Sequence, residues 1–210
     1  MSKVLEQLQW RYATKKFDTE RKLSSAKIDT LKAAFDLTAT SFGLQPLKLV
    51  IIADNKLKGQ LVNHSFNQQM VGDCSHLLVF CIEQGVSEDY IRDHFNLIEE
   101  VRQTSRDILD PYQAYLIEHF KDKPSTEIDD WMTKQAYLAM GNLLTVCAME
   151  EIDACPMEGF DPMQYDQLLG LRERGLRSVL VMPVGYRHKD DFFSQLRKVR
   201  RGVDEVVIEV

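Results

Sequence analysis

Residues 126–151 read TEIDDWMTKQAYLAMGNLLTVCAMEE and form the longest helical pattern of this 210-residue chain. Apolar side chains from Trp131 to Met149 surround most of the helix circumference, which is typical of a helix buried on all sides. In a chain of this size, an interface with a second copy is the natural place for such a helix. The stretch therefore predicts a long central helix and a homodimer.

Outside this stretch the chain changes irregularly between helical and strand patterns. Asp110-Pro111 is expected to break the polar helical stretch of residues 87–121 into two pieces. The other expected helices lie near residues 4–12, after a cap at Ser24 or Ser25, over residues 56–63, and from Asp161-Pro162 to Gly170. The expected strands cover residues 47–53, 76–82, 177–185 and 204–210. Because there is no regular strand–helix repeat, we expect one α+β domain over residues 1–210.

Composition excludes several classes of protein. A net charge of -6 and a pI near 5.4 argue against a general nucleic-acid binder, which needs a basic face. Three of the four cysteines lie in apolar stretches and none has C-x-x-C spacing, which predicts free thiols in a reducing compartment. No signal peptide, membrane span or metal-ligand cluster is visible, so we expect a cytoplasmic protein that binds neither membranes nor metals.

The absence of glycine-rich motifs restricts how a nucleotide can bind. The ten glycines never occur as G-x-G, which removes the Rossmann fingerprint and the Walker A loop. Any phosphate must therefore be held by side chains. Two basic clusters are candidates, at residues 11–16 and 197–201, because Arg and Lys match phosphate oxygens. Each cluster alone is more often a solvated charged stretch, and the two make one site only if the fold brings the chain ends together.

Three separated segments resemble one family in the same order. Arg11-Tyr12-Ala13-Thr14-Lys15-Lys16-Phe17-Asp18 is similar to the opening motif of the nitroreductase family of flavoproteins. Residues 131–142 and 153–161 resemble the central helix and flavin-facing loop of that family's oxygen-insensitive NAD(P)H nitroreductase and dihydropteridine reductase branch. Pro183-Val184-Gly185-Tyr186 and Lys198-Val199-Arg200 resemble its closing segments. The resemblance spans nearly the whole chain.

The resemblance implies a central mixed or antiparallel sheet flanked by helices, an intertwined homodimer, and FMN held at the dimer interface. It places Arg11, Lys198 and Arg200 on the FMN phosphate, and Lys15 at the pyrimidine edge, where a cation would stabilise the negative charge of the reduced flavin. The remaining cofactor contacts that it implies are Tyr12, Ala13, Thr40, Ser41, Gly43, Asn67, Met70, Gln135, Pro156, Met157, Glu158 and Gly159. Thr40, Ser41 and Gly43 match a loop that the second subunit offers to the flavin.

The chain departs from the family pattern at three of these positions. The family often has His and Ser where Tyr12 and Ala13 stand, so Ala13 supplies no hydroxyl. Met70 stands where the branch often has a second lysine. Two interpretations of Met70 stay open: the side chain packs on the ring edge, or the flavin site is less positive and harder to reduce. Outside these positions, residues 112–120 align loosely with a lid over the acceptor, lined by Tyr115, Ile117 and Phe120.

The activity implied is two-electron transfer from NAD(P)H to quinones, nitroaromatics or pteridines by a ping-pong mechanism. No protein nucleophile or acid–base pair is needed, because the cofactor supplies the chemistry. No dedicated dinucleotide site is visible, so NADH and NADPH stay equally open. A flavin-binding protein without catalytic activity, and an FMN enzyme of the same scaffold with another reductive chemistry, are the alternatives.

Overall fold

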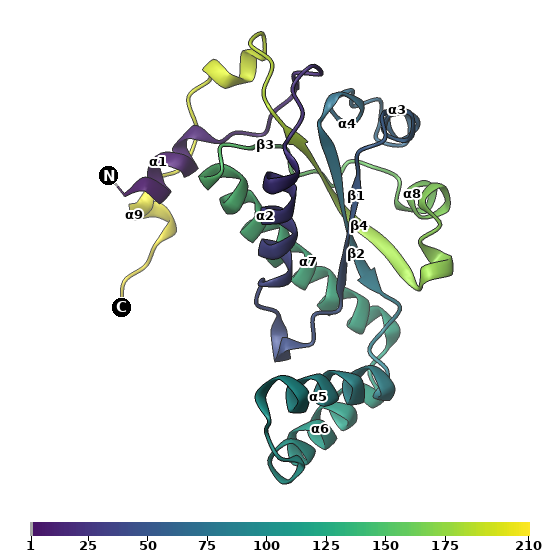
Figure 1. The fold of residues 1–210 in the computed structure, drawn as a ribbon. Coiled ribbons are helices and arrows are strands. Elements are labelled where there is room, and N and C mark those ends of the chain that lie inside the picture. Colours follow the sequence, from purple (N-terminus) through teal and green to yellow (C-terminus); the bar gives the residue numbers. More distant parts are fainter. Residues whose placement is uncertain (1) are drawn as a thin grey trace.

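The computed structural model describes residues 2–210 and consists of a four-stranded sheet with helices on both faces (Figure 1). The strands are β1 (Leu47–Ile52), β2 (His76–Glu83), β3 (Asp153–Ala154) and β4 (Leu176–Gly185). The helices are α1 (Lys3–Trp10), α2 (Ser25–Asp36), α3 (Asn55–Asn63), α4 (Met70–Asp73), α5 (Glu88–Arg102), α6 (Arg106–Lys121), α7 (Ser125–Met149), α8 (Pro162–Leu169) and α9 (Val203–Val206). The α+β class predicted from the sequence is confirmed.

The sheet has the order β1-β2-β4-β3, and every pair of neighbours is antiparallel. At one end of β2, Ile82 pairs with Leu47, the first residue of β1. At the other end, His76 pairs with Val184, which also pairs with Ala154 of β3. The loop before β1 and the segment after β3 therefore lie at opposite ends of the sheet.

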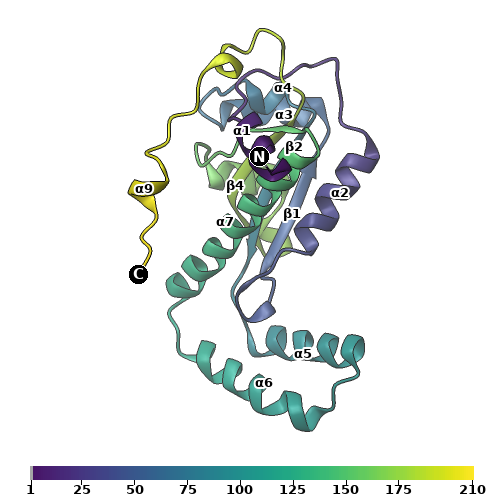
Figure 2. The same ribbon diagram turned by 90° about the vertical axis from the view of Figure 1, so that its left-hand side faces the viewer.

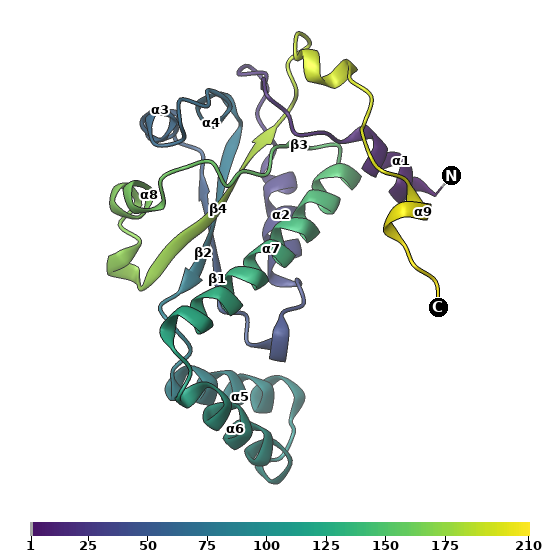
Figure 3. The ribbon, with the colours of Figure 1, turned by 180° about the vertical axis from the view of Figure 1, so that it is seen from behind.

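Alternation along β2 explains why both faces of the sheet are covered. Side chains of Leu78, Phe80 and Ile82 enter a core cluster that contains residues of α2 and α7. The intervening side chains of β2 enter a second cluster with residues of α3, α4 and α8. Strands buried on both faces read as continuous apolar runs, as the sequence of β2 does. Figures 1 and 3 show α2 and α7 on the same side of the sheet.

Helix α7 crosses the whole length of the sheet, as Figure 3 shows from behind. Its buried positions include Met132, Ala136, Ala139 and Leu143, none of which has exposed surface. The expectation of a helix buried on all sides is met on the sheet side only. Side chains such as Leu138 leave about half their surface open, at 52% exposure. An apolar stripe of α7 is thus left uncovered in the single chain.

The two helices α5 and α6 form a hairpin beyond the end of the sheet (Figures 1 and 2). The predicted break at Asp110-Pro111 is wrong, because Pro111 lies inside α6. The chain breaks earlier, where Gln103 takes a left-handed conformation with φ 56 and its N–H closes α5 on the carbonyl of Glu99. Arg106 then starts α6 with its side chain bound to Glu99, at 2.6 Å from Nε to Oε2. Capping at these residues decides the boundary more strongly than the proline does.

The chain ends in a segment that does not join the sheet. The predicted strand over residues 204–210 is wrong, because Val203–Val206 is a short helix and the residues after it form no strand. A strand needs a neighbour to bind its backbone groups, and this segment points away from the sheet (Figure 1). Its apolar side chains are open to solvent, with Val206 and Ile208 at 64% and 87% exposure. Within residues 2–210, no helix has the length and hydropathy that crossing a membrane requires.

Candidate functional site

The two basic clusters predicted from the sequence lie together in the fold. The Nζ of Lys198 donates a hydrogen bond to the carbonyl of Arg11. Burial, and after it the neighbouring cations, lowers the pKa of both residues, and Arg200 is among those neighbours in each case. Among residues 2–210, no carboxylate forms an ion pair with Arg11, Lys198 or Arg200. We call these three residues the cation cluster; their charge is available to an anion.

Asp191 holds the segment after α1 in place. Its Oδ2 accepts from the backbone N–H groups of Lys15 and Lys16, at 2.9 and 3.0 Å, and from the Tyr12 hydroxyl at 2.9 Å. Burial opposes ionisation of Asp191, but these donors together hold its pKa below the ordinary value. The pKa of Tyr12 is raised, first by burial and then by its bond to this carboxylate. Asp191 thus stays ionised and orders the backbone on which Lys15 stands.

The same segment runs alongside β3. The backbone N–H of Thr14 donates to the carbonyl of Ala154 at 3.3 Å, and Ala13 forms a parallel bridge with that residue. One residue further on, the Nζ of Lys15 lies 3.4 Å from the Sγ of Cys155. Burial raises the pKa of the Cys155 thiol, although the charge of Lys15 opposes this. Lys15 is therefore brought to the start of the predicted flavin-facing loop.

Residues 156–159 form a loop pinned to β4. Met157 and Val181 exchange backbone hydrogen bonds of 2.9 and 3.1 Å. The Nε2 of Gln68 donates to the carbonyl of Gly159 at 2.9 Å, and a Cβ at this glycine would lie 3.0 Å from the same nitrogen. A side chain at position 159 would therefore crowd Gln68, which would have to shift by a few tenths of an ångström. Pro156, which precedes Met157, is half-buried.

Glu158 is the exposed side chain of this loop. Its Oε1 accepts from the Tyr137 hydroxyl at 2.7 Å, and this bond raises the pKa of Tyr137. Tyr137 belongs to α7 and is 46% exposed. The loop therefore rests against the open side of α7.

Asn67 and Met70 lie beside this loop but in different environments. Asn67 is exposed and follows Phe66, and both have left-handed backbone conformations, with φ 59 and 51. The ring of Phe66 lies 3.6 Å from the place where a Cβ of Gly159 would be. Met70 is only 4% exposed and belongs to the second core cluster. The predicted contact of Met70 with a flavin edge stays a prediction.

Thr40, Ser41, Gly43 and Gln135 form a second group. The backbone N–H of Ser41 donates to Oε1 of Gln135 at 2.9 Å, and the hydroxyl of Thr40 accepts from the N–H of Gln45 at 3.0 Å. Gly43 has φ +72, a conformation that glycine adopts without cost. The polar residue predicted on α7 is thus bonded to the predicted loop.

The predicted lid lies beside this second group, where Phe42 contacts Phe120. Phe120 is buried against Trp131, with ring centroids 5.1 Å apart, whereas Tyr115 is 55% exposed. Ile117 is partly buried against the first core cluster. Of the three predicted lid residues, Tyr115 is the one whose side chain is open to a ligand.

The two groups lie on opposite sides of α7. Gln135 points to Ser41 and is 7% exposed, whereas Tyr137 points to Glu158 and is 46% exposed. Two residues along a helix turn it through about 200°, so these side chains face opposite ways. A single chain therefore does not present both groups to one ligand. The first group contains Arg11, Tyr12, Ala13, Lys15, Asn67, Pro156, Met157, Glu158, Gly159, Lys198 and Arg200, and the second contains Thr40, Ser41, Gly43 and Gln135.

Known proteins share both the sequence pattern and this architecture. The nitroreductase family profile matches residues 8–186. The chain belongs to the nitroreductase family. It is 29% identical to the oxygen-insensitive NAD(P)H nitroreductase of Salmonella typhimurium, over 95% of this chain and 96% of that protein. It is 27% identical to the major NAD(P)H-flavin oxidoreductase of Aliivibrio fischeri, over 97% of each.

Solved structures show the same fold. A protein from Exiguobacterium sibiricum, crystallised in complex with FMN, superposes with a TM-score of 0.86 at 16% identity, covering all of this chain and 98% of that one. The nitroreductase family fold expected from the sequence is thereby confirmed. Residues of this family member that no sequence motif indicated are Asp191, Gln68, Phe42 and Phe66. Asp191 and Gln68 act through tertiary hydrogen bonds, for which a single sequence carries no signal.

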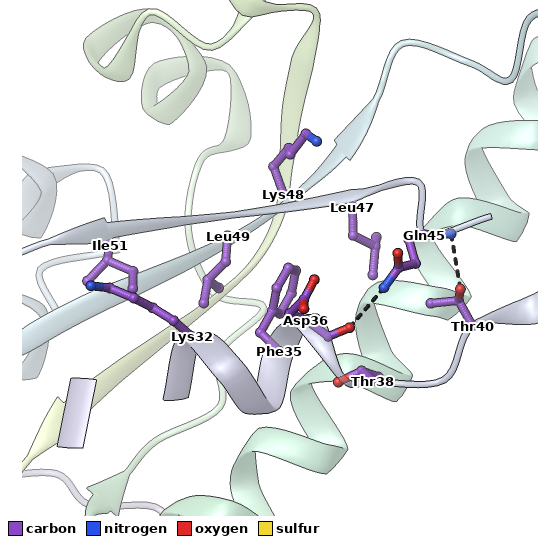
Figure 4. Close-up of a pocket in the computed structure, with 10 residues that line it drawn as sticks. All are labelled: Lys32, Phe35, Asp36, Thr38, Thr40, Gln45, Leu47, Lys48, Leu49 and Ile51. Atoms are coloured by element: carbon purple, nitrogen blue, oxygen red, sulfur yellow. Dashed lines mark hydrogen bonds between the residues drawn. The ribbon is translucent and has the colours of Figure 1, made fainter. Parts of the chain in front are cut away.

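A groove of about 310 Å³ lies between α2 and β1 and reaches the second group at Thr40 (Figure 4). Lys32 and Ile51 lie at one end, and Thr40 and Gln45 at the other. Thr40 is the one predicted cofactor residue among those that line it. The groove follows the edge of β1 that has no strand beside it within residues 2–210. Among these residues, no group of His, Cys, Asp or Glu is arranged to hold a metal.

Proposed function

We propose that this protein is an FMN-dependent NAD(P)H oxidoreductase that transfers two electrons to quinones, nitroaromatics or pteridines. The cation cluster carries this proposal. It brings together Arg11 and two residues nearly 190 positions later, with no carboxylate to balance their charge among residues 2–210. A phosphate dianion fits such a cluster, since charge-assisted hydrogen bonds to Arg and Lys are its strongest side-chain contacts. Curated relatives of the chain are NAD(P)H nitroreductases and a flavin oxidoreductase.

The remaining residues of the first group suit a planar ring. Gly159 has no side chain, so a flat ligand could approach the backbone of the loop closely at this residue. Lys15 would hold the pyrimidine edge; its ammonium group lies 3.4 Å from the Sγ of Cys155, at the start of the loop. Asn67 would bind the pyrimidine ring from the other side of the loop. In this arrangement Glu158 positions Tyr137 and is not a general acid.

When bound, FMN would supply hydride acceptance from NAD(P)H and electron delivery to the acceptor, each at the same open face and in turn. The protein residues bind, orient and exclude water. Lys15 adds a positive charge where negative charge would accumulate. Tyr115, on the exposed face of α6, would cover the acceptor.

The functional unit in this proposal is an intertwined homodimer. The two groups lie on opposite sides of α7, so the second group of one protomer would complete the first group of its partner. Exposed apolar residues on α1, α7 and the C-terminal segment would be covered at the interface. The C-terminal segment alternates Val206, Ile208 and Val210, and β1 has an unpaired edge with a groove beside it. The segment of the partner would fit this edge as an added strand.

We also propose that the protein works in the cytoplasm. All four cysteines are free and buried, which suits the reducing conditions of the cytoplasm.

Anaerobic reduction tests the activity. Protein reconstituted with FMN is mixed with NADPH or NADH, and the visible absorbance of the oxidised flavin is followed. We expect bleaching, and recovery of the colour when menadione or a nitroaromatic is added. A flavin-binding protein without catalytic activity keeps its colour. Bleaching without reoxidation by any quinone, nitroaromatic or pteridine would favour another reductive chemistry.

A further inference from the structure

Arg187, two residues after the end of β4, is bound to a buried carboxylate of β3. Its Nε donates to Oδ1 of Asp153 at 2.7 Å, and its backbone N–H donates to Oδ2 of the same carboxylate at 2.8 Å. The side chain of Asp153 is only 5% exposed, and that of Arg187 is 24% exposed. Charge-assisted bonds of this kind fix the geometry of a guanidinium as well as binding it. Asp153 therefore determines where the Arg187 guanidinium lies.

Two aromatic rings lie against the same guanidinium. Its Cζ is 4.2 Å from the centroid of the Trp10 ring and 4.7 Å from that of Tyr12. Both distances are within the range of about 6 Å over which a cation is attracted to an aromatic ring. Trp10 is the last residue of α1, and Tyr12 comes two residues later. One side chain thus binds both neighbours of Arg11 in the chain.

These contacts decide where Arg11 points. The backbone at Arg11 is extended, with φ -69 and ψ 145, and consecutive side chains of an extended segment point in opposite directions. With Trp10 and Tyr12 turned toward Arg187, the side chain of Arg11 is directed away from Arg187. Burial, and after it the charge of Arg200, lowers the pKa of Arg11. Arg11 therefore faces the other members of the cation cluster.

The charge of Arg187 is balanced, unlike the charge of the cation cluster. Asp153 forms an ion pair with Arg187. The three members of the cation cluster form no ion pair within the described part of the chain, residues 2–210. Because opposite charges in contact cancel much of each other's field, a paired arginine attracts an anion less than an unpaired one. Arg187 is suited to hold Arg11 in place, and Arg11 to bind the anion.

We propose that Arg187 is a positioning residue for the cofactor phosphate, and that it acts by directing Arg11 into the cation cluster. The inference rests on the proposed function, because the cation cluster is the phosphate site of that proposal. Arg187 itself does not touch the phosphate. Without its guanidinium, residues 10–12 lose the contact that orients them, and the Arg11 side chain spends less time facing the phosphate. The contacts of the flavin ring are unchanged.

Flavin affinities of single and double variants test this inference. Fluorescence titration of the full-length apoprotein measures the dissociation constants of FMN and of riboflavin, which lacks the phosphate. The proteins compared are the wild type, Arg187→Met, Arg11→Ala and the double variant. Methionine keeps much of the aliphatic stem and removes the charged, planar group. Arg174→Met is the control, because Arg174 is exposed and precedes β4, whereas Arg187 follows it.

Arg187→Met should raise the FMN dissociation constant about three- to tenfold, a part of the loss expected when the Arg11 contact is removed entirely. Riboflavin should bind this variant as it binds the wild type, and Arg174→Met should match the wild type for both ligands. In the Arg11→Ala background, Arg187→Met should have no further effect on FMN, since the effects of two residues that act through one contact do not add.

Three results would overturn the proposal. The first is an equal fold-change for FMN with and without Arg11, because Arg187 would then act independently of it. The second is an equal loss of riboflavin affinity in Arg187→Met, and the third is an unchanged FMN constant in that variant. If Arg11→Ala itself binds FMN as tightly as the wild type, the phosphate site of the proposed function fails instead.

Variants of Trp10 cover the case in which Arg187→Met does not fold, since that change leaves the buried Asp153 carboxylate without its ion pair. Trp10→Leu and Trp10→Phe both keep the pair. Trp10→Leu removes one of the rings that hold the guanidinium, so it should raise the FMN dissociation constant and leave that of riboflavin unchanged. Trp10→Phe keeps a ring and should raise the FMN constant less. Equal FMN constants for both variants and the wild type would contradict the proposed role of the rings.

Discussion

Tyr12 and Asp191 are 179 positions apart in the chain, and the Tyr12 hydroxyl donates to Oδ2 of Asp191 at 2.9 Å. The same oxygen accepts from the backbone N–H groups of Lys15 and Lys16. The bond thus fixes the segment that carries both Arg11 and Lys15. Family members that have His at the position of Tyr12 would make this bond differently. In this chain Tyr12 joins the segment after α1 to the C-terminal part of the chain, whether or not it also contacts a ligand.

Replacing Asp191 should destabilise the protein in a pH-dependent way. The carboxylate accepts charge-assisted bonds, so Asp191→Asn should lower the free energy of unfolding by about 1.5–3 kcal/mol at neutral pH. Because the pKa of Asp191 is lowered in the fold, its contribution is present above the ordinary value of 3.8 and is lost as pH falls through the folded pKa. Urea titrations between about pH 3 and 7 should show the difference from wild type shrinking in acid.

Asp190→Asn is the control for this prediction, since its side chain is 62% exposed beside Asp191. A pH-independent difference between Asp191→Asn and wild type would show that the loss is one of packing and not of charge.

Removing a member of the cation cluster should weaken FMN binding. Each charge-assisted hydrogen bond contributes about 1.5–3 kcal/mol, so Arg11→Ala, Lys198→Ala and Arg200→Ala should each raise the FMN dissociation constant more than about tenfold. Riboflavin, which lacks the phosphate, should bind all three variants as it binds the wild type. Lys189→Ala provides a control on an exposed lysine. Fluorescence titration of the apoprotein measures both ligands, and an unchanged FMN constant in all three variants would exclude a phosphate site here.

Much of the fold was predictable because local signals agreed with tertiary packing. Ser24 and Asp161 cap α2 and α8 as their sequence positions suggest, and the apolar run of β2 lies in the centre of the sheet. The two errors have local causes. Pro111 was given more weight than the left-handed cap at Gln103, and the alternation of residues 204–210 indicates a strand whose neighbour the single chain does not contain.

The site was predictable only in part. Its basic residues and loop motif are visible in the sequence, and the family resemblance grouped them. The positions that anchor them are not visible, because Gln68 and Asp191 act on backbone groups 91 and more than 170 positions away. Phe42 was missed for another reason. A left-handed phenylalanine contradicts ordinary propensity, so sequence rules assign that conformation to the neighbouring glycine.

Deleting residues 203–210 should disrupt the dimer. These residues make no strand in their own chain and expose Val203, Val206 and Ile208. If they add to the β1 edge of the partner, the truncated protein should sediment partly or wholly as a monomer and lose bound FMN. The full-length chain should sediment as a dimer, at twice the 24.3 kDa of one chain, at micromolar concentration. A truncated protein that remains a dimer with full FMN content would show that the segment is dispensable for assembly.

Lys15→Met should make the bound flavin harder to reduce. A positive charge about 4 Å from the ring edge is worth about 4 kcal/mol at an effective dielectric of about 20, and we expect about a quarter of this to persist beside solvent. Since about 1.4 kcal/mol corresponds to about 30 mV for two electrons, the midpoint potential should fall by about 20–30 mV. Lys16→Met is the matched control, because Lys16 is exposed and its Nζ makes no contact with Cys155. Potentiometric titration with a reference dye measures all three proteins, and FMN content must be equal among them. An unchanged or raised midpoint in Lys15→Met would mean that the ammonium group does not face the pyrimidine edge, even though Cys155 holds it beside the loop.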